Sequence, residues 1–183
     1  MITKILVGLG NPEKRYEQTR HNAGFMALER LAEANGLEWK ENKRFNSLVA
    51  TRGQTLLLKP QTYMNNSGLA VRAALSYYKL LPKSLLSTKK DSDLNEVLTV
   101  IHDDLDIPLG KYKISTDSRS AGHNGVQSII DHLKTKNFKR IRIGILTELK
   151  NKMPGEKFVL DNFRKDEIKT IFTIIKKILS III

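Results

Sequence analysis

The sequence predicts a single α/β domain with a twisted, mixed and largely parallel sheet and helices on both of its faces. Strand-like apolar runs alternate along the chain with segments in which apolar residues recur at helical spacing, the order that builds βαβ units. A chain of 183 residues can bury one sizeable core, and no internal repeat divides it. We therefore expect one domain over residues 1–183.

The first half of the chain predicts three strands and two helices. TKILVGL is typical of a buried strand, and GFMALERLAEANG of an amphipathic helix that ends at Gly36. NSLVATR and QTLLLKP flank Gly53 and predict a β-hairpin. NNSGLAVRAALSYYKLL predicts the second helix, and the polar stretch over residues 82–96 predicts an exposed loop.

The second half predicts three further strands and two helices. EVLTVIHD is apolar without alternation, which indicates a strand buried on both faces. KYKIS predicts a short strand and HNGVQSIIDHLKT a helix, while FKRIRIGIL alternates so that Arg140 and Arg142 share one face. From about Asp161 the chain predicts an amphipathic helix, with Asp161 or Asn162 as its N-cap.

The composition narrows the function classes. Since there is no cysteine, disulfides, thiolate metal sites and a cysteine nucleophile are excluded. The N-terminus lacks a signal-peptide pattern, and Lys176 and Lys177 interrupt the apolar C-terminal segment, so we expect a cytoplasmic protein with no membrane partner. The net charge of +12 favours a polyanionic partner, nucleic acid first, although lysine-rich proteomes also yield basic proteins without one.

Four polar segments follow expected strands or open an expected helix. They are Gly8-Leu9-Gly10-Asn11-Pro12, Gln61-Thr62-Tyr63-Met64-Asn65-Asn66-Ser67-Gly68, His102-Asp103-Asp104-Leu105-Asp106 and Ser120-Ala121-Gly122-His123-Asn124-Gly125. Each alone is explained by a turn, a cap or a strand end. Ligands of open α/β sheets bind beyond the carboxyl ends of the strands. Because all four segments converge on that edge, we expect the functional site there.

The chemistry available at this edge is limited. A dinucleotide-binding fingerprint needs a third glycine where this chain has Glu13, which argues against a nucleotide-binding or dehydrogenase-like domain. There is no Gly-x-Ser-x-Gly elbow, and the four histidines lack zinc-site spacing, so we expect no metal and no cofactor. One histidine as general base, a carboxylate to hold its tautomer and several asparagines remain. That set suits direct attack by an activated water on an ester.

Five motifs occur in order between about Lys4 and Ile145. They are VGLGNPEKRYEQTRHNAGF, KPQTYMNNSG, VIHDDLDIPLGKYKI, SAGHNGVQSI and FKRIRIGI. Together they resemble the bacterial-type peptidyl-tRNA hydrolase family, and the ordered set is far more specific than any one motif. The resemblance implies hydrolysis of the ester between a peptide and the 3′-terminal ribose of tRNA, which releases tRNA for reuse in translation.

The same resemblance implies a role for each matching residue. His21 is the expected catalytic base, Asp103 orients it, and Asn11 recognises the N-blocked, peptide-like end of the substrate. Further residues are expected to contact the tRNA end and the peptide backbone or, in the case of methionine, to line the cleft floor: Tyr16, Tyr63, Asn65, Asn124 and Met64. The basic C-terminal half is expected to hold acceptor-stem phosphates.

Some details are hypotheses, and one alternative function is open. For Asn11, we expect the side-chain carbonyl to accept the N–H of a blocked substrate inside a neutral cleft. For His102 and His123, we expect structural roles at a strand end and a helix start. The alternative is a non-catalytic RNA-binding protein on the same fold. In either case we expect a monomer.

Overall fold

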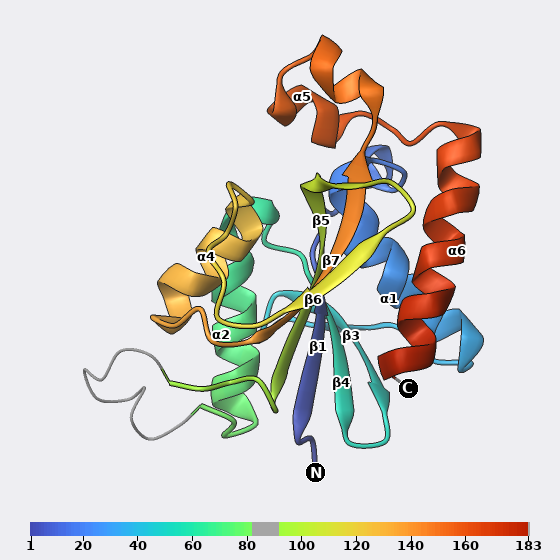
Figure 1. Ribbon diagram of the computed structural model, residues 1–183. Helices are drawn as coiled ribbons and strands as arrows, with labels where there is room; N and C mark the ends of the chain where they lie inside the picture. Colours follow the sequence, from blue (N-terminus) through green and yellow to red (C-terminus); the bar gives the residue numbers. More distant parts are fainter. Residues whose placement is uncertain (82–91, 183) are drawn as a thin grey trace.

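The computed structural model describes residues 1–81 and 92–182, and its elements follow the alternation that the sequence predicts (Figure 1). The strands are β1 (Lys4–Gly8), β2 (Lys40–Asn42), β3 (Ser47–Arg52), β4 (Thr55–Pro60), β5 (Leu98–Pro108), β6 (Tyr112–Ser115) and β7 (Lys139–Leu146). The α-helices are α1 (Ala23–Ala34), α2 (Ser67–Tyr77), α4 (Asn124–Leu133), α5 (Gly155–Leu160) and α6 (Lys165–Ile182). Short 3₁₀ helices are η1 (Lys14–Tyr16), η2 (Arg20–Asn22), η3 (Met64–Asn66) and η4 (Glu148–Lys152).

The strands form one mixed seven-stranded sheet in the order β2-β3-β4-β1-β5-β7-β6. Its centre is parallel, because β1 pairs in parallel with β4 and β5, and β5 pairs in parallel with β7. The outer pairs β2–β3, β3–β4 and β6–β7 are antiparallel, and β3–β4 is the hairpin predicted around Gly53. The predicted fold class is therefore confirmed.

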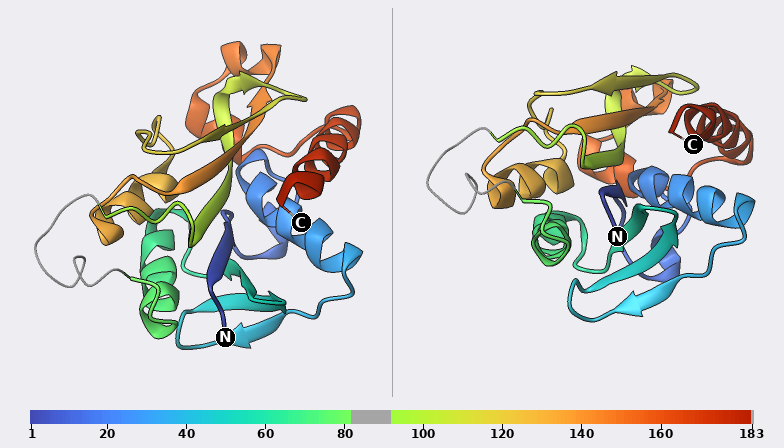
Figure 2. Two further views of the ribbon diagram at one scale, coloured as in Figure 1. Left: turned by 60° about the horizontal axis from the view of Figure 1, so that its bottom comes forward. Right: turned by 90° about the horizontal axis from the view of Figure 1, so that it is seen from below.

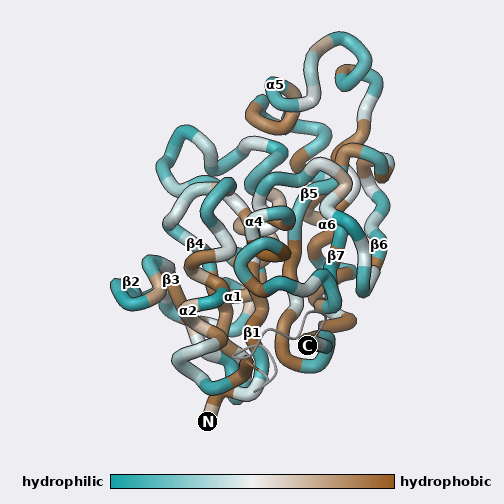
Figure 3. Tube along the Cα trace, turned by 90° about the vertical axis from the view of Figure 1, so that its left-hand side faces the viewer, coloured by the Kyte–Doolittle hydropathy of each residue, from teal (hydrophilic) through white to brown (hydrophobic). Residues whose placement is uncertain are grey.

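Helices cover both faces of the sheet (Figures 1 and 2). One core packs α1, α5 and α6 against alternate strand residues such as Leu6, Leu57 and Ile101. The other packs α2 and α4 against the intervening residues, such as Val7 and Val100. This is the period of two of a pleated strand, so the inner strands are apolar on both sides. The hydrophobic stretches of the trace accordingly gather on inner strands and inward helix faces (Figure 3).

The C-terminal region differs from the prediction. Helix α6 begins at Lys165 rather than near Asp161, and a separate short helix, α5, precedes it. Asp161 has an extended backbone and pairs with Arg20, so it does not cap α6. The N–H of Arg164 instead donates to the Glu167 carboxylate at 2.8 Å, which satisfies one of the unpaired donors at the helix start.

Two other expectations need correction. The predicted loop over residues 82–96 falls partly outside the described residues, and within the described part Leu94 is buried rather than exposed. Its N–H donates to the carbonyl of Asn137 at 2.8 Å, which ties this segment to the residues just before β7. Strand β5 extends to Pro108, so His102 and Asp103 lie inside the strand and not after it.

The parallel strands bring the predicted polar segments to one edge of the sheet. Asn11 follows β1, Met64 follows β4, and Asp103 lies at the middle of the long strand β5. The N-terminus of α4, with His123 and Asn124, reaches the same edge. None of the helices built from the described residues is both long and apolar enough to cross a membrane.

Candidate active site

His21 lies in η2, directly before α1, and its imidazole faces Asp103 of β5. Nδ1 of His21 lies 3.0 Å from Oδ1 and 3.1 Å from Oδ2 of Asp103. A carboxylate ion only accepts hydrogen bonds, so Nδ1 carries the hydrogen and Nε2 keeps its lone pair. This tautomer, assigned from the hydrogen bond, has a ring nitrogen that can accept a proton.

His123 shares the same carboxylate, which corrects the expectation that it is only a residue at a helix start. Its Nδ1 accepts the N–H of Val126 at 3.3 Å and so caps α4. Its Nε2 therefore carries the hydrogen and donates to Oδ1 of Asp103 at 3.0 Å. The His21 and His123 rings lie 4.7 Å apart, centroid to centroid. Two imidazoles from distant parts of the chain thus converge on one buried carboxylate.

The environment keeps Asp103 ionised. Burial alone would raise the pKa of the Asp103 carboxyl, but the neighbouring His21 and His123, through charge and hydrogen bonds, hold that pKa well below its usual range. For His21, burial acts to lower the pKa, while the charge of Asp103 and its hydrogen bond raise it, and the net shift is upward from 6.5. Asp103 is therefore charged at neutral pH, and it stabilises the protonated form of His21.

His102 contacts both Asp103 and His123. Its Nδ1 donates to the backbone carbonyl of Asp103 at 2.7 Å, and its ring meets that of His123 edge-on with centroids 4.7 Å apart. Burial, followed by the nearby His123, lowers the pKa of His102 well below 6.5, so this ring stays neutral. The structural role predicted for His102 agrees with this geometry.

The donor set could in principle hold a metal ion. Among the described residues, one group of this kind is formed by His21, Asp103 and His123, whose ligating atoms lie within 4.8 Å of one another. Both imidazole hydrogens already point at the carboxylate, and the two hydrogen bonds account for the close approach of these groups. Hydrogen bonding of the two imidazoles to one carboxylate therefore explains the arrangement.

Asn11 is held by side chain and backbone, and the structure corrects the expected use of its carbonyl. Asn22 clamps the Asn11 backbone: its Oδ1 accepts the Asn11 N–H at 2.8 Å and its Nδ2 donates to the Asn11 carbonyl at 3.0 Å. Oδ1 of Asn11 accepts the N–H of Met64 at 2.9 Å. The side-chain carbonyl thus already accepts one internal hydrogen bond, whereas Nδ2 makes none within the described residues and is the side-chain group with its full hydrogen-bonding capacity free.

The other predicted contact residues surround this position. Met64 is buried and packs against Gly125 at the start of α4, as a floor residue would. The turn η3, which contains Asn65, packs against α4, where Asn124 is exposed at the N-terminus. Tyr63 is 47% exposed, whereas Tyr16 is half-buried. All eight predicted residues therefore lie along one edge of the sheet, although Asn11, Tyr16, Tyr63, Met64 and Asn65 lie outside the cavity at His21.

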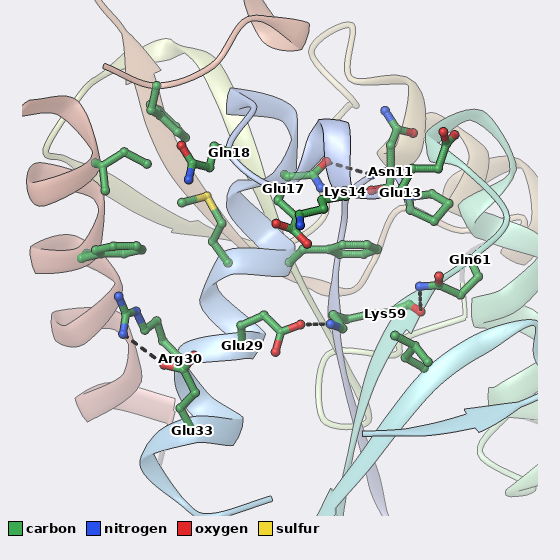
Figure 4. Close-up of a pocket in the computed structure, with 18 of the residues that line it drawn as sticks. Asn11, Glu13, Lys14, Glu17, Gln18, Glu29, Arg30, Glu33, Lys59 and Gln61 are labelled. Carbon is green, nitrogen blue, oxygen red and sulfur yellow. Dashed lines mark hydrogen bonds and ion pairs between the residues drawn. The ribbon is translucent and has the colours of Figure 1, made fainter. Parts of the chain in front are cut away.

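A cavity and a groove lie at this edge of the sheet. A cavity of about 260 Å³ is lined by His21, Asp103, His123 and Asn124, and α5 contributes Val159 to its wall. A groove of about 940 Å³ runs between α1, α6 and β4, with Asn11 near one end and the Glu29–Lys59 ion pair on its floor (Figure 4). Neither His21 nor Asp103 lines the groove. Both line the smaller cavity, which is therefore the candidate active site.

Sequence reasoning missed Arg20, which anchors η2 to the C-terminal region. Its side chain is fully buried and donates to the Asp161 carboxylate at 3.2 Å, to the Asn162 carbonyl at 3.0 Å and to the Glu167 carboxylate at 2.7 Å. The guanidinium also lies 4.4 Å from the centroid of the Phe158 ring of α5. A charged residue directly before the expected base was the available signal, because buried arginines need specific partners.

The basic C-terminal half was expected to bind phosphates, but its two arginines in β7 are engaged in contacts within the protein. Arg140 is buried and donates to the Arg119 carbonyl at 2.9 Å, and burial, with Arg142 nearby, lowers its pKa to about 10. Arg142 pairs with Asp104 at 2.7 Å. Their shared strand face, which the alternation predicts, therefore serves internal contacts.

Comparisons with known proteins agree with the motifs. The family model described as peptidyl-tRNA hydrolase matches residues 5–183. The peptidyl-tRNA hydrolase of Bacillus subtilis is 46% identical over 167 residues, which cover 89% of this chain and 81% of that protein. That of Synechocystis is 45% identical over 150 residues, covering 79% and 70%. The crystal structure of peptidyl-tRNA hydrolase from Acinetobacter baumannii has a TM-score of 0.82 at 31% identity, covering 98% of this chain and 87% of that chain.

Removal of the Arg20 charge should destabilise the protein strongly. Arg20→Met leaves the carboxylate of Glu167, itself 5% exposed, without its cation, and this should lower the free energy of unfolding by about 3–5 kcal/mol. Arg30→Met is the matched control, because it breaks an exposed ion pair with Glu33 and should cost about 0–1 kcal/mol. Urea unfolding of both variants measures the difference. Equal losses would show that Arg20 does not anchor η2.

Proposed function

The chain belongs to the peptidyl-tRNA hydrolase family, and we propose that His21 is the general base with which it hydrolyses the ester of peptidyl-tRNA. The reaction frees the peptide and the tRNA by attack of water on the carbonyl carbon that joins the peptide to the 3′-terminal ribose. One observation carries the assignment of His21: Nδ1 is held by the Asp103 carboxylate at 3.0 and 3.1 Å. Nε2 is therefore the nitrogen that is free to take a proton.

The proposed step moves one proton and forms one carbon–oxygen bond. Nε2 of His21 takes a proton from the water as its oxygen attacks the ester carbonyl. The imidazolium that forms is stabilised by Asp103, which stays ionised throughout. The protonated His21 can then give this proton to the 3′ oxygen of the ribose as the bond between that oxygen and the carbonyl carbon breaks. His123, which donates to the same carboxylate, keeps that carboxylate in place.

Asn11 is proposed to distinguish blocked from free substrates through its Nδ2 group. Since Oδ1 is occupied by the Met64 N–H, the side chain presents a donor. A peptidyl or acetylated substrate has an amide carbonyl next to the aminoacyl residue, and that carbonyl can accept from Nδ2. An unblocked aminoacyl-tRNA lacks this carbonyl and has an ammonium, which a neutral donor repels.

The tRNA end is proposed to meet the rim of the site. Tyr16 and Tyr63 supply aromatic faces for the single-stranded CCA nucleotides, and Asn65 and Asn124 supply amides for the ribose or the peptide backbone. Met64 forms the floor. The positive charge of the protein, +12 in total, supports binding of the acceptor-stem phosphates. We further propose that the protein acts as a monomer in the cytoplasm, where peptidyl-tRNA arises during translation.

A non-catalytic RNA-binding protein on the same fold is the less favoured alternative. Such a protein needs amides and aromatics on its surface but no base and no orienting carboxylate. Maintaining the buried Asp103 carboxylate between two imidazoles requires removal of a charge from water, which costs folding free energy. A protein that only binds RNA does not need this buried carboxylate, so the loss of folding free energy would serve no function.

The His21→Ala variant should bind substrate but hydrolyse it slowly. Loss of a general base should lower kcat by roughly 10²–10⁴-fold, with a much smaller change in KM. The measurement is release of tRNA from N-acetyl-aminoacyl-tRNA under steady-state conditions. His132→Ala is the matched control, since Nδ1 of His132 donates to the Ser128 carbonyl within α4 and the ring does not line the cavity. Similar turnover in both variants would exclude His21 as the base.

The Asp103→Asn variant should alter the pH dependence as well as the rate. His21 must be neutral to accept a proton, so activity falls as the pH falls through its pKa. Asp103 raises that pKa above 6.5, so the acidic limb of the pH–kcat profile should move to lower pH in Asp103→Asn, while kcat at the plateau falls by about 10²–10⁴-fold. Asp106→Asn, at an exposed position of β5, is the control. A limb at the same pH in all three proteins would contradict the assignment.

The Asn11→Asp variant should lose discrimination between blocked and free substrates. An aspartate still accepts the Met64 N–H but lacks the Nδ2 donor and attracts an ammonium. We expect kcat/KM for N-acetyl-aminoacyl-tRNA to fall by the equivalent of about 1–3 kcal/mol, the cost of one unpaired polar group. The ratio of this value to that for free aminoacyl-tRNA should therefore decrease. If the ratio matches that of the unmutated protein, Asn11 serves only the turn.

A further inference from the structure

Two residues on the rim of the site have backbone conformations that favour glycine. Glu13 has φ 84° and ψ 139°, and Tyr63 has φ 58° and ψ 164°. A side chain at such angles crowds the backbone, so both positions are strained. Glu13 lies two residues after Asn11, and Tyr63 directly precedes Met64, whose N–H binds Asn11. Both of these strained residues therefore lie in the two loops that hold Asn11.

These two strained residues contact each other. The Tyr63 hydroxyl donates to Oε1 of Glu13 at 2.5 Å. Arg15 pairs with the same carboxylate, with Nη2 3.2 Å from Oε1 and Nε 3.2 Å from Oε2, and its guanidinium lies 4.7 Å from the centroid of the Tyr16 ring. One carboxylate thus links Tyr63, on the loop after β4, to Tyr16, on the loop after β1.

Fold stability does not explain this arrangement. The side chains of Glu13 and Arg15 are 41% and 67% exposed, and ion pairs exposed to this extent contribute little to folding. A glycine at position 13 adopts the same backbone without strain. Strained side chains that bring no compensating stability are typical of sites where geometry serves function.

The hydrogen bond defines the state of both groups. The hydrogen bond from Tyr63 lowers the pKa of the Glu13 carboxyl, and its effect is larger than that of Arg15. The same contact raises the pKa of the Tyr63 phenol. At neutral pH the carboxylate is therefore charged and accepts, and the phenol is neutral and donates.

We propose that Glu13 is a positioning residue that holds Tyr63 and Tyr16 as a single aromatic platform for the 3′-terminal nucleotides of tRNA. The inference rests on the proposed contacts of these two tyrosines with the tRNA end. Stacking of bases on aromatic rings requires the rings to stand in a defined orientation, and an exposed tyrosine without a partner loses rotamer freedom when it binds. Glu13 fixes both rings in advance, so that freedom is already lost before tRNA arrives.

The Glu13→Gly variant separates this role from folding. Since glycine relieves the backbone strain, the melting temperature should stay the same or rise by a few degrees. KM for N-acetyl-aminoacyl-tRNA should rise about 3- to 10-fold, a fraction of the stacking contribution of one base, while kcat stays within about twofold. Glu13→Gln, whose Oε1 still accepts from Tyr63, should raise KM less. Glu17→Gln is the control, because Glu17 is an exposed carboxylate on the same segment whose side chain makes no hydrogen bond or ion pair with either tyrosine among the described residues.

A double-mutant cycle tests the coupling to Tyr63. Tyr63→Phe keeps the ring but lacks the hydroxyl, so KM for Glu13→Gly/Tyr63→Phe should lie well below the product of the two single increases. An unchanged KM in Glu13→Gly, or two increases that simply multiply, would overturn the proposal. Hydrolysis by the unmutated protein is measured in the same series. Its absence would instead refute the proposed function and is distinguishable from either result.

Discussion

The functional edge of the sheet depends on one buried carboxylate, that of Asp103. It is 2% exposed, and transfer of such a charge from water is unfavourable unless strong hydrogen bonds replace the lost hydration. Here two imidazole N–H groups replace it, one from η2 and one from the start of α4. Because these donors belong to segments about one hundred residues apart in sequence, the carboxylate also fixes where η2 and α4 sit on the sheet. The reactive tautomer of His21 is thus a consequence of packing.

The sequence Arg20-His21-Asn22 shows how a single turn serves three contacts. A 3₁₀ turn has about three residues per turn, so successive side chains point in three directions about 120° apart. Arg20 points to Glu167 and the α5–α6 junction, His21 points to Asp103, and Asn22 points to the Asn11 backbone. Each contact restricts the others, since η2 cannot rotate without breaking all three. His21, the proposed base, is therefore held from both sides by its neighbours in the chain.

The sequence predicted the parts of this structure that depend on local pattern. Strand alternation and helical spacing predicted six of the seven strands, all except the short β2, and most helices. The rule for parallel sheets placed Asn11 and Asp103 at one edge. What it could not predict was the pairing of specific polar groups. The carbonyl of Asn11 is occupied by an N–H that lies 53 residues away in sequence.

Two further corrections have the same origin. His123 is a ring at a helix start by pattern and a donor to Asp103 only through the fold. The start of α6 moved from Asp161 to Lys165 because Arg20, distant in sequence, binds Asp161 and Glu167 and gives this segment contacts that outweigh its local capping preference. In each case a long-range hydrogen bond decides between locally equivalent states. The motif resemblance singled out His21 and Asn11 as candidates, and the geometry shows which atoms of each are engaged within the protein: Nδ1 of His21 and Oδ1 of Asn11.

The most direct test of this account is the ring of His21 itself, observed by ¹⁵N NMR as a function of pH. The signals are assigned by comparison with a His21→Gln protein. The account predicts that, in the neutral ring, Nδ1 is protonated and Nε2 has the chemical shift of an unprotonated nitrogen, with a pKa above 6.5. A neutral ring protonated at Nε2, or a pKa below 6.5, would contradict it, because the lone pair that must accept the proton of water would then face Asp103 or the carboxylate would not stabilise the imidazolium.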